Sequence, residues 1–225
     1  EVRHRLLARC EPFLVLGDVI VQRAAALGAG GDFVAHVSPP SVVSSCLINR
    51  QVLKGQTCRD VKTADSFQGA LKNLNLPMNA VGFLTAADVS QFQQVFLSHG
   101  PLWVHAIATV GLTNARASGD EADVPLEGRK LPTGTINLWV ACNALPGITG
   151  RLEAIQTATG AKVAALRDAE VKSRKSDRPA AGTGTDCVAI AASGELPYDY
   201  CGMHTVIGEL IGKAVYKVIR GGIAS

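Results

Sequence analysis

The segment Gly182-Thr183-Gly184-Thr185-Asp186 places two hydroxyls and a carboxylate between glycines, directly before an apolar run. Glycines let the backbone turn sharply and expose N–H groups, which can bind an anion or the oxyanion of an acyl-transfer reaction. Asp186 could activate water, and Thr183 or Thr185 could act as a nucleophile beside a base. The alternative is structural: Asp186 closes an Asx-type turn, and the threonines bind local backbone.

These glycines do not form a nucleotide-binding loop. Cys187 stands where a GxGxxG loop has its third glycine, and the glycines precede the apolar run Val188–Ala192 instead of following a strand. A Walker loop is excluded because the sequence contains no GK[ST]. The segment is therefore expected to be a polar turn that leads into a buried strand.

His204 is a second candidate, in the turn before the last apolar segment. Histidine is the usual acid or base near neutral pH, although here it could also simply cap or pack a helix. Glu209 lies about 140° further round that helix, so it is expected to pair with Lys213 instead. Gly208 and Gly212 indicate close packing against another element or a second chain, which permits a homodimer.

Two further polar residues could contact a substrate. Asn114 follows an apolar run in "GLTNARASGD" and could bind a polar group, or it could close a loop. Lys162 lies near the angular position of Ile155 in a predicted helix, so it should flank the apolar stripe of that helix. A catalytic zinc is not expected, because His99 and His105 are six apart and no HxxxH, HExxH or CxxC occurs.

The composition limits the possible partners. The chain has 225 residues, of which 47% are hydrophobic and 5% aromatic, so a core of Ala, Val, Leu and Ile is expected. A net charge of +3 is too small to indicate nucleic-acid binding, and no apolar stretch is long enough for a membrane helix. One basic cluster is expected to be a solvated loop or a contact for an anionic group: Lys172, Arg174, Lys175 and Arg178.

The six cysteines predict a reducing compartment, and we expect the cytoplasm. None of them has CxxC spacing, and the chain is long for a disulfide scaffold, so free thiols are predicted. Cys142 and Cys187 lie in apolar runs and are expected to be buried. The chain begins with Glu1 and has no initiator Met, which is compatible with removal of a leader.

The candidate residues need a scaffold of strands and helices. Strands are predicted over 2–9, 13–21, 80–84, 103–112, 135–143 and 188–192, with a polar loop of about twenty residues before the strand at 135. Helices are predicted over 63–76, 149–171 and from 206 to a stop at Gly221-Gly222, with Pro77 ending the first and Thr205 capping the last. In the helix over 149–171, the expected buried stripe is Leu152, Ile155, Thr159, Val163 and Leu166.

This order predicts an α+β or α/β fold: one domain over residues 1–225, with a mixed β-sheet flanked by helices and a long amphipathic C-terminal helix.

Six motifs occur in sequence order: "GFLTAADV", "GLTNARASGD", "GTINLWVACNA", "TATGAKVAAL", "GTGTD" and "YCGMHTVIGELIGKAV". Together, over about residues 80 to 220, they resemble the adenosylcobinamide amidohydrolase family of corrinoid salvage. The resemblance implies hydrolysis of the amide between aminopropanol and the propionyl side chain of the corrin ring, which gives adenosylcobyric acid. The implied catalytic residues are Asp186, His204, Thr185 and Thr183, and the implied substrate-binding residues are Asn114, Lys162, Gly182, Gly184 and Thr85.

The resemblance also implies a small-molecule corrinoid as the partner. Its cobalt would arrive with the substrate, so no cofactor of the protein's own is expected, and neither nucleic acid nor membrane is an expected partner. If the chemistry uses all these residues together, Thr183, Thr185 and Asp186 must face the same pocket as His204.

One position departs from the family pattern. The pattern usually reads Thr-Glu-Ala-Lys, whereas this chain has Thr159-Gly160-Ala161-Lys162. If the glutamate assists catalysis, the chain could be slow, altered in substrate or inactive, so a non-catalytic corrinoid-binding or carrier protein stays an alternative, as does a hydrolase of another amide. Glycine within a helix costs roughly 1 kcal/mol relative to alanine, so Gly160 is expected to make room for a neighbour.

Overall fold

A computed structural model describes residues 14–16, 19–23, 31–35, 41–44, 46–51, 63–73, 75, 80–123 and 134–225. The predicted strand over 2–9 and the predicted helix stop at Pro77 lie outside these residues, as does the second half of the predicted polar loop, from 124 to 133.

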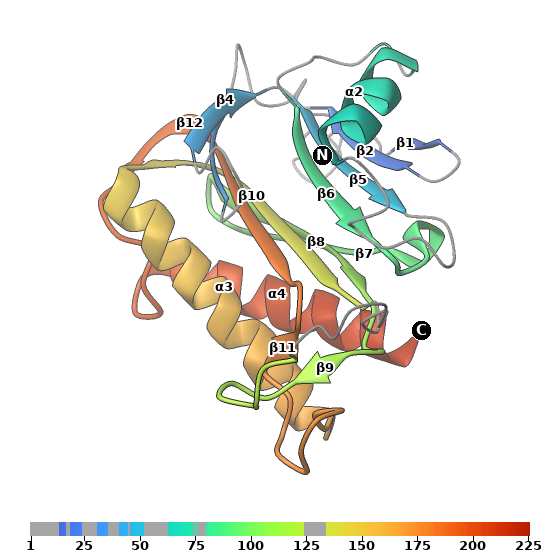
Figure 1. The fold of residues 1–225 in the computed structure, drawn as a ribbon. Coiled ribbons are helices and arrows are strands. Elements are labelled where there is room, and N and C mark those ends of the chain that lie inside the picture. Colours follow the sequence, from blue (N-terminus) through green and yellow to red (C-terminus); the bar gives the residue numbers. More distant parts are fainter. Residues whose placement is uncertain are drawn as a thin grey trace.

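The centre of the fold is a six-stranded mixed sheet (Figure 1). Its strands follow the order β4 (Ser41–Ser44), β3 (Gly31–Ala35), β12 (Cys187–Tyr198), β10 (Ile136–Pro146), β8 (Leu102–Val110) and β7 (Gln93–His99). Only β10 and β12 pair in parallel, and the other neighbours are antiparallel. The sheet is therefore mixed, as the sequence predicts.

Two smaller sheets complete the strands. A four-stranded sheet has the order β1 (Leu14–Leu16), β2 (Val19–Arg23), β5 (Cys46–Gln51) and β6 (Val81–Thr85). A short antiparallel ribbon joins β9 (Ala115–Arg116) to β11 (Gly182–Thr183). This ribbon leads directly into the candidate turn before β12.

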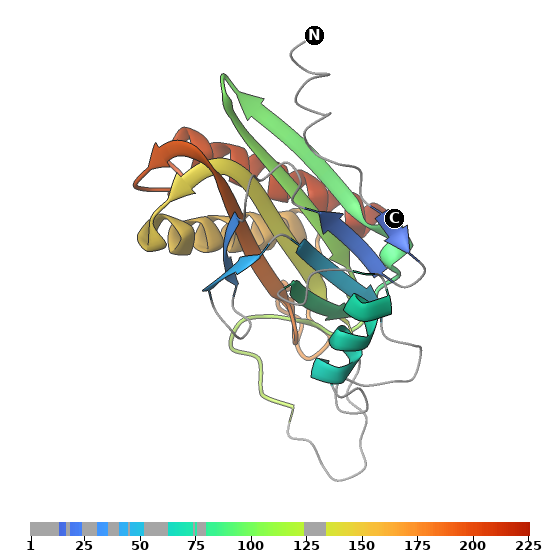
Figure 2. The same cartoon turned by 90° about the horizontal axis from the view of Figure 1, so that it is seen from above.

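The helices and the second sheet cover opposite faces of the central sheet (Figures 1 and 2). Helices α3 (Ile148–Asp168) and α4 (Val206–Ala224) pack on one face. The four-stranded sheet packs on the other, beside the short helix α2 (Thr63–Asn73) and the 3-10 turn η2 (Val89–Gln91). Because α3 and α4 share one face of a largely antiparallel sheet, the fold class is α+β, and the predicted class is confirmed.

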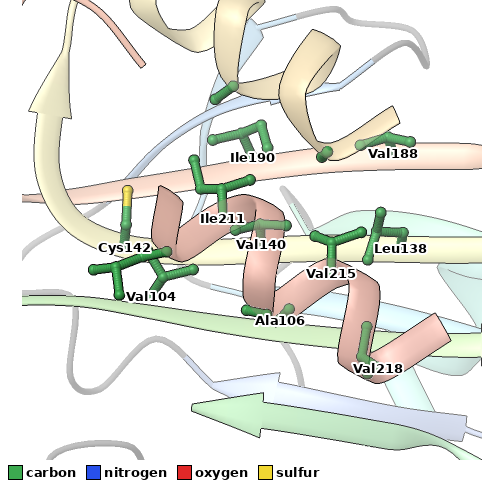
Figure 3. Packing of buried hydrophobic residues seen from close by; sticks show 14 of the residues in the cluster. Val104, Ala106, Leu138, Val140, Cys142, Val188, Ile190, Ile211, Val215 and Val218 are labelled. Carbon is green, nitrogen blue, oxygen red and sulfur yellow. The ribbon is translucent and has the colours of Figure 1, made fainter. Parts of the chain in front are cut away.

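The central strands are apolar on both faces because both faces are covered. Along β10, Leu138 and Val140 face the helices, while Trp139 and Ala141 face the second sheet. In Figure 3 the helix-facing side chains interleave with residues of α4 such as Ile211. These strands therefore form near-continuous apolar runs in the sequence, which explains why β8, β10 and β12 were predictable.

The predicted buried stripe of α3 is right for Leu166, which is buried, and for Ile155, which packs against the core, but it is wrong for Leu152. Leu152, expected in its apolar stripe, is 56% exposed, whereas Ala154, Ala158 and Lys162 are buried. Small alanines let the helix approach its neighbours closely, so side-chain size as well as hydrophobicity determines which face of α3 is buried. Lys162 accordingly lies within the buried face of α3 and does not flank that face.

The predicted stop of α4 is also wrong. Thr205 caps the helix as expected, but the helix continues through Gly221 and Gly222 to Ala224. A Cβ atom at Gly222 would lie 2.5 Å from a methyl carbon of Val110, and one at Gly221 would lie 2.9 Å from Gln93. These glycines therefore serve close packing against β7 and β8 instead of ending the helix.

None of the helices in the described part of the chain combines the length and apolar character needed to cross a bilayer.

Candidate active site

Asp186 organises the turn between β11 and β12. Its Oδ1 accepts hydrogen bonds from the backbone N–H of Ile136 (3.0 Å), the backbone N–H of Thr183 (3.1 Å) and the hydroxyl of Thr183 (2.5 Å). Its Oδ2 accepts a bond from Nζ of Lys162 in α3. A carboxylate with four donors is held in one orientation, so Asp186 joins the turn to α3 and to the start of β10.

The pair formed by Lys162 and Asp186 is nearly buried. The two side chains are only 7% and 12% exposed. Removing one partner of such a pair leaves an uncompensated charge in a poorly solvated place, so each residue depends on the other. Lys162 was predicted to bind substrate, and the structure shows that its ammonium group is engaged by Asp186.

Gly182 is required by this ion pair. A Cβ atom at that position would lie 2.2 Å from Oδ2 of Asp186 and 2.8 Å from Nζ of Lys162. Both distances are too short for real contacts, so any side chain here would displace the pair. The glycine supplies space, because its φ is not among the positive values that occur at Gly100 and Gly119.

Thr185 is tied to the start of β10. Its hydroxyl lies 2.9 Å from the carbonyl oxygen of Gly134 and 2.7 Å from the hydroxyl of Thr135, which also lies 2.7 Å from the carbonyl oxygen of Thr185. Thr135 is buried, and sequence analysis did not single it out. The only signal was its place in "GTINL", a hydroxyl residue immediately before a buried strand.

Asn114 lies against the same turn. Its Nδ2 is 3.3 Å from the Cβ position of Gly184, and its Oδ1 is 2.7 Å from the Cβ position of Gly134. Asn114 follows β8, which pairs with β10, so two neighbouring strands place it beside the turn. Asn114 belongs to the polar loop that precedes β10, and the described part of this loop contributes Asn114 to the site.

Thr85 closes β6 at the same edge, but its hydroxyl has a local role. It is 2% exposed and accepts a hydrogen bond from the backbone N–H of Ala87 (3.0 Å). The neighbouring carbonyl of Leu84 accepts a bond from Nδ2 of Asn137 in β10 (2.9 Å). Eight of the nine predicted site residues therefore gather at one edge of the central sheet: Asp186, Thr183, Thr185, Asn114, Lys162, Gly182, Gly184 and Thr85.

The end of α4 lies near Asp186. Gly222 of this helix packs against Val110, and Val110 pairs with Ile136. The backbone N–H of Ile136 donates to Asp186. His204 precedes α4, which begins at Val206 and rises about 24 Å to Gly222 at 1.5 Å per residue. No hydrogen bond or ion pair in the described part of the chain joins His204 to Asp186, so a pocket shared by the two residues stays a prediction.

Helix α3 also separates the two places. The segment before α4 binds one flank of α3, where the hydroxyl of Thr157 donates to the carbonyl of Cys201 (3.2 Å). Lys162 is five residues further on, about 140° round the helix, and faces Asp186 on the other flank.

The motif around His204 builds a helix start. The hydroxyl of Thr205 donates to the carbonyl of Gly202 (2.8 Å) and accepts from the N–H of Gly208 (3.0 Å), as an N-cap does. A Cβ atom at Gly208 would lie 2.0 Å from the carbonyl oxygen of Gly202. Glu209 and Lys213 form the expected ion pair, and the His204 side chain itself is exposed.

Large exposed apolar side chains gather at the starts of α3 and α4. Leu152 belongs to the first turns of α3, and Met203 precedes α4 and lies against Gly160 of α3. The full set among the described residues is Ile148, Leu152, Tyr200, Met203 and Val206. His204 is thus surrounded by apolar surface, whereas Asp186 is surrounded by polar groups.

The basic cluster forms a solvated loop beside β9. All four basic side chains are exposed, and two of them reach acidic partners, with Lys175 at 3.3 Å from Asp123 and Arg178 at 4.0 Å from Asp120. Hydrogen bonds from the Ser173 and Ser176 hydroxyls lower the pKa of Asp120 to about 2. This carboxylate therefore fixes the loop next to the candidate turn.

Three cysteines are free thiols, namely Cys142, Cys187 and Cys201, and two of them are poor nucleophiles. Burial raises the pKa of Cys142 to about 12 and that of Cys201 to about 11, so both stay protonated at neutral pH. Cys187 was expected to be buried but is only half-buried, because it begins β12 at the edge of the core. Within the described ranges no three His, Cys, Asp or Glu side chains form a metal-binding group.

A threonine hydroxyl that donates to a carboxylate, with an ammonium group on the same carboxylate and an amide beside the turn, is an arrangement suited to acyl transfer. The fold and the site thus define an α+β protein with a candidate acyl-transfer site.

The family model described as adenosylcobinamide amidohydrolase matches residues 41–225, so the chain belongs to this amidohydrolase family. The match extends the resemblance seen over about 80 to 220 toward the N-terminus. The chain is also 34% identical over 98 residues to an uncharacterized protein of Methanocaldococcus jannaschii, which covers 42% of this chain and 38% of that protein.

Proposed function

We propose that the chain hydrolyses the amide between aminopropanol and the propionyl side chain of the corrin ring in adenosylcobinamide, which yields adenosylcobyric acid. Membership of the amidohydrolase family supports the reaction type. The observation that carries the proposal is the nearly buried carboxylate of Asp186, held by Lys162 and bonded to the Thr183 hydroxyl. The corrin cobalt is part of the substrate, so the proposal requires no metal ligand from this site.

Amide hydrolysis needs a base, donors for the oxyanion and a proton for the leaving amine. Asp186 can take a proton from Thr183 or from a water bound in its place, and can return it to the amine. The side-chain amide nitrogen of Asn114 lies 3.3 Å from the Cβ position of Gly184, and we assign the oxyanion to this part of the turn. His204 is left out of this scheme because its side chain is exposed and no contact in the described part of the chain joins it to Asp186.

The test is product formation. Adenosylcobinamide is incubated with the protein and with its Asp186→Asn variant, and adenosylcobyric acid is sought by mass spectrometry. We expect product with the unaltered chain and at least a hundredfold less with the variant, as is usual for loss of a general base. Absence of product at high protein concentration, while another family member is active in parallel, would rule the proposal out.

A second candidate is a corrinoid-binding protein without hydrolysis, and Gly160 favours it. A Cβ atom at Gly160 would lie 3.2 Å from the terminal methyl of Met203, beside His204 and about 200° round α3 from Lys162. A glutamate here would lie at the His204 end. If the family's chemistry takes place there, this chain lacks its carboxylate and binds without turnover.

The two candidates differ in the effect of Gly160→Glu. If hydrolysis takes place at Asp186, this substitution leaves turnover within a few-fold of the unaltered chain. If it takes place at the His204 end, the unaltered chain binds adenosylcobinamide without product, and Gly160→Glu gains activity. Binding is measured by calorimetry and turnover by mass spectrometry.

A further inference from the structure

The two threonines of the turn differ in where their hydroxyl protons can go. We propose that Thr183 is the nucleophile of a covalent route, with Asp186 as its base, and that Thr185 and Thr135 are positioning residues. This inference rests on the proposed amide hydrolysis and decides between the two threonines, which the sequence leaves equivalent.

Thr183 can lose its proton to a base. Its Oγ1 lies 2.5 Å from Oδ1 of Asp186, and an ionised carboxylate only accepts, so the hydroxyl must be the donor. Lys162 binds the other carboxylate oxygen and keeps Oδ1 directed at Thr183. Thr183 is half-buried, so its oxygen is held and not fully enclosed.

Within the residues that the structure describes, the hydroxyl of Thr185 contacts no base. Three short contacts link it to Thr135 and Gly134, and the two hydroxyls supply only two protons for them. In every arrangement these protons go to a carbonyl oxygen or to the other hydroxyl, and neither removes a proton at neutral pH. The contacts therefore fix the turn to β10 and do not activate an oxygen.

Thr135 is the anchor of this arrangement. It is 5% exposed and immediately precedes β10, so its hydroxyl is fixed by the central sheet. The next residue, Ile136, donates its N–H to Asp186. Two consecutive residues thus hold both halves of the turn, with Thr135 on Thr185 and Ile136 on the carboxylate.

The covalent route balances as follows. Oγ1 of Thr183 bonds to the amide carbonyl carbon while its proton passes to Asp186, and the oxyanion forms. The C–N bond then breaks, and the proton on Asp186 passes to the amine nitrogen. Aminopropanol is released, and the acyl group stays on Thr183 as an ester. Water gives a proton to Asp186 and attacks the ester, and this proton returns to Oγ1 as the acid is released. The sum is amide plus water giving acid plus amine.

The experiment uses the full chain with adenosylcobinamide and five variants: Thr183→Val, Thr183→Ser, Thr185→Val, Thr135→Val and Thr135→Ser. We expect Thr183→Val to lower kcat about a thousandfold with little change in KM, and Thr183→Ser to stay within about tenfold, because the hydroxyl is kept. Thr185→Val and Thr135→Val should each lower kcat about tenfold. Thr135→Ser, which keeps the hydroxyl, should retain most of the kcat that Thr135→Val loses.

A covalent intermediate is sought directly in the unaltered chain. Acid-quenched samples should carry the mass of the substrate acyl group, and peptide fragmentation should place it on Thr183. Thermal denaturation checks that each variant is folded, and the mapping on the unaltered chain does not depend on any variant.

The outcomes separate this inference from the proposed function. If the unaltered chain forms no product, the proposed function fails and this inference fails with it. If it forms product but the adduct maps to Thr185, or Thr183→Val keeps more than a tenth of kcat, only the assignment of the nucleophile is overturned. Product without any adduct in quenched samples would assign the attack to water.

Discussion

The two ends of the helical layer use similar residues for different purposes. At one end the Asp186 carboxylate accepts from two backbone N–H groups, from a threonine and from Lys162. At the other, Glu153 accepts from the N–H of Cys201 (2.8 Å), and Thr205 caps α4 beside the exposed His204.

The difference is in burial and in the partners of each hydroxyl. The Thr183 hydroxyl donates to a carboxylate beside a nearly buried ammonium group, whereas the Thr205 hydroxyl donates to a backbone carbonyl. A motif rich in His, Thr and Gly therefore need not mark chemistry. The acceptor of the hydroxyl proton is the more informative observation, and the following predictions test it.

The largest effect on stability should come from breaking the nearly buried lysine–carboxylate pair, compared with breaking an exposed one. Lys162→Met leaves Asp186 charged and nearly buried, so we expect the free energy of unfolding to fall by about 3 kcal/mol or more. Lys213→Met breaks the exposed pair with Glu209 in α4 and should change it by less than about 0.5 kcal/mol. Urea denaturation measures both, and equal losses would show that burial does not distinguish the two ends.

Two glycines of α4 should behave oppositely. Gly208→Ala puts a Cβ atom 2.0 Å from the carbonyl oxygen of Gly202 and should cost about 2–3 kcal/mol, because backbone must move. Gly212→Ala meets nothing within 4 Å and should be neutral or stabilise by up to about 1 kcal/mol. If chemical denaturation found Gly208→Ala harmless, the close helix start described for the His204 end would be incorrect.

His105, which lies between the two sheets, should make the free energy of unfolding depend on pH. Burial lowers the pKa of His105 from 6.5 to about 4. Between these values the unfolded chain binds the proton and the folded chain does not, so stability falls as the pH is lowered. We expect a loss of about 2 kcal/mol between pH 7 and pH 5.

Urea denaturation at several pH values checks this slope, with His105→Gln as the control. The variant should be nearly independent of pH over the same range. An unchanged slope in His105→Gln would assign the dependence to another group.

The smallest effect concerns Gly160. A Cβ atom there meets only the flexible end of the exposed Met203 side chain, so Gly160→Ala should stabilise the chain by about 0.5–1 kcal/mol. Gly150, in the same helix, is the matched control, because a Cβ atom would lie 2.8 Å from the carbonyl oxygen of Asp199. Gly150→Ala should destabilise, and a loss of similar size at Gly160 would show that Gly160 does make room for a neighbour.

The fold was predictable where one feature determined the element. Apolar runs marked β8, β10 and β12, and the cap at Thr205 marked the start of α4. Strand β7 escaped prediction because its glutamines interrupt the apolar pattern at the edge of the sheet. The exposure of Leu152 in α3 escaped it because alanines form the buried face, and hydrophobicity alone favours the larger leucine.

The candidate site was predictable by residue but not by grouping. Polar residues beside the ends of apolar strands, such as Asn114 and Asp186, do lie together. The predicted strand ended at residue 192, whereas β12 continues to Tyr198, so the sequence did not show how far the chain runs from Asp186 before it reaches His204. Thr135 was missed because its role depends on a contact with Thr185, fifty residues away.

The most direct test compares kcat for adenosylcobinamide hydrolysis in Asp186→Asn and His204→Ala. Our proposal assigns the reacting groups to Asp186 and its neighbours, so the first variant should lose at least about a hundredfold in kcat and the second should stay within about threefold. Both variants are checked for folding by thermal denaturation. A larger loss in folded His204→Ala than in folded Asp186→Asn would contradict the account and move the chemistry to the other end of the molecule.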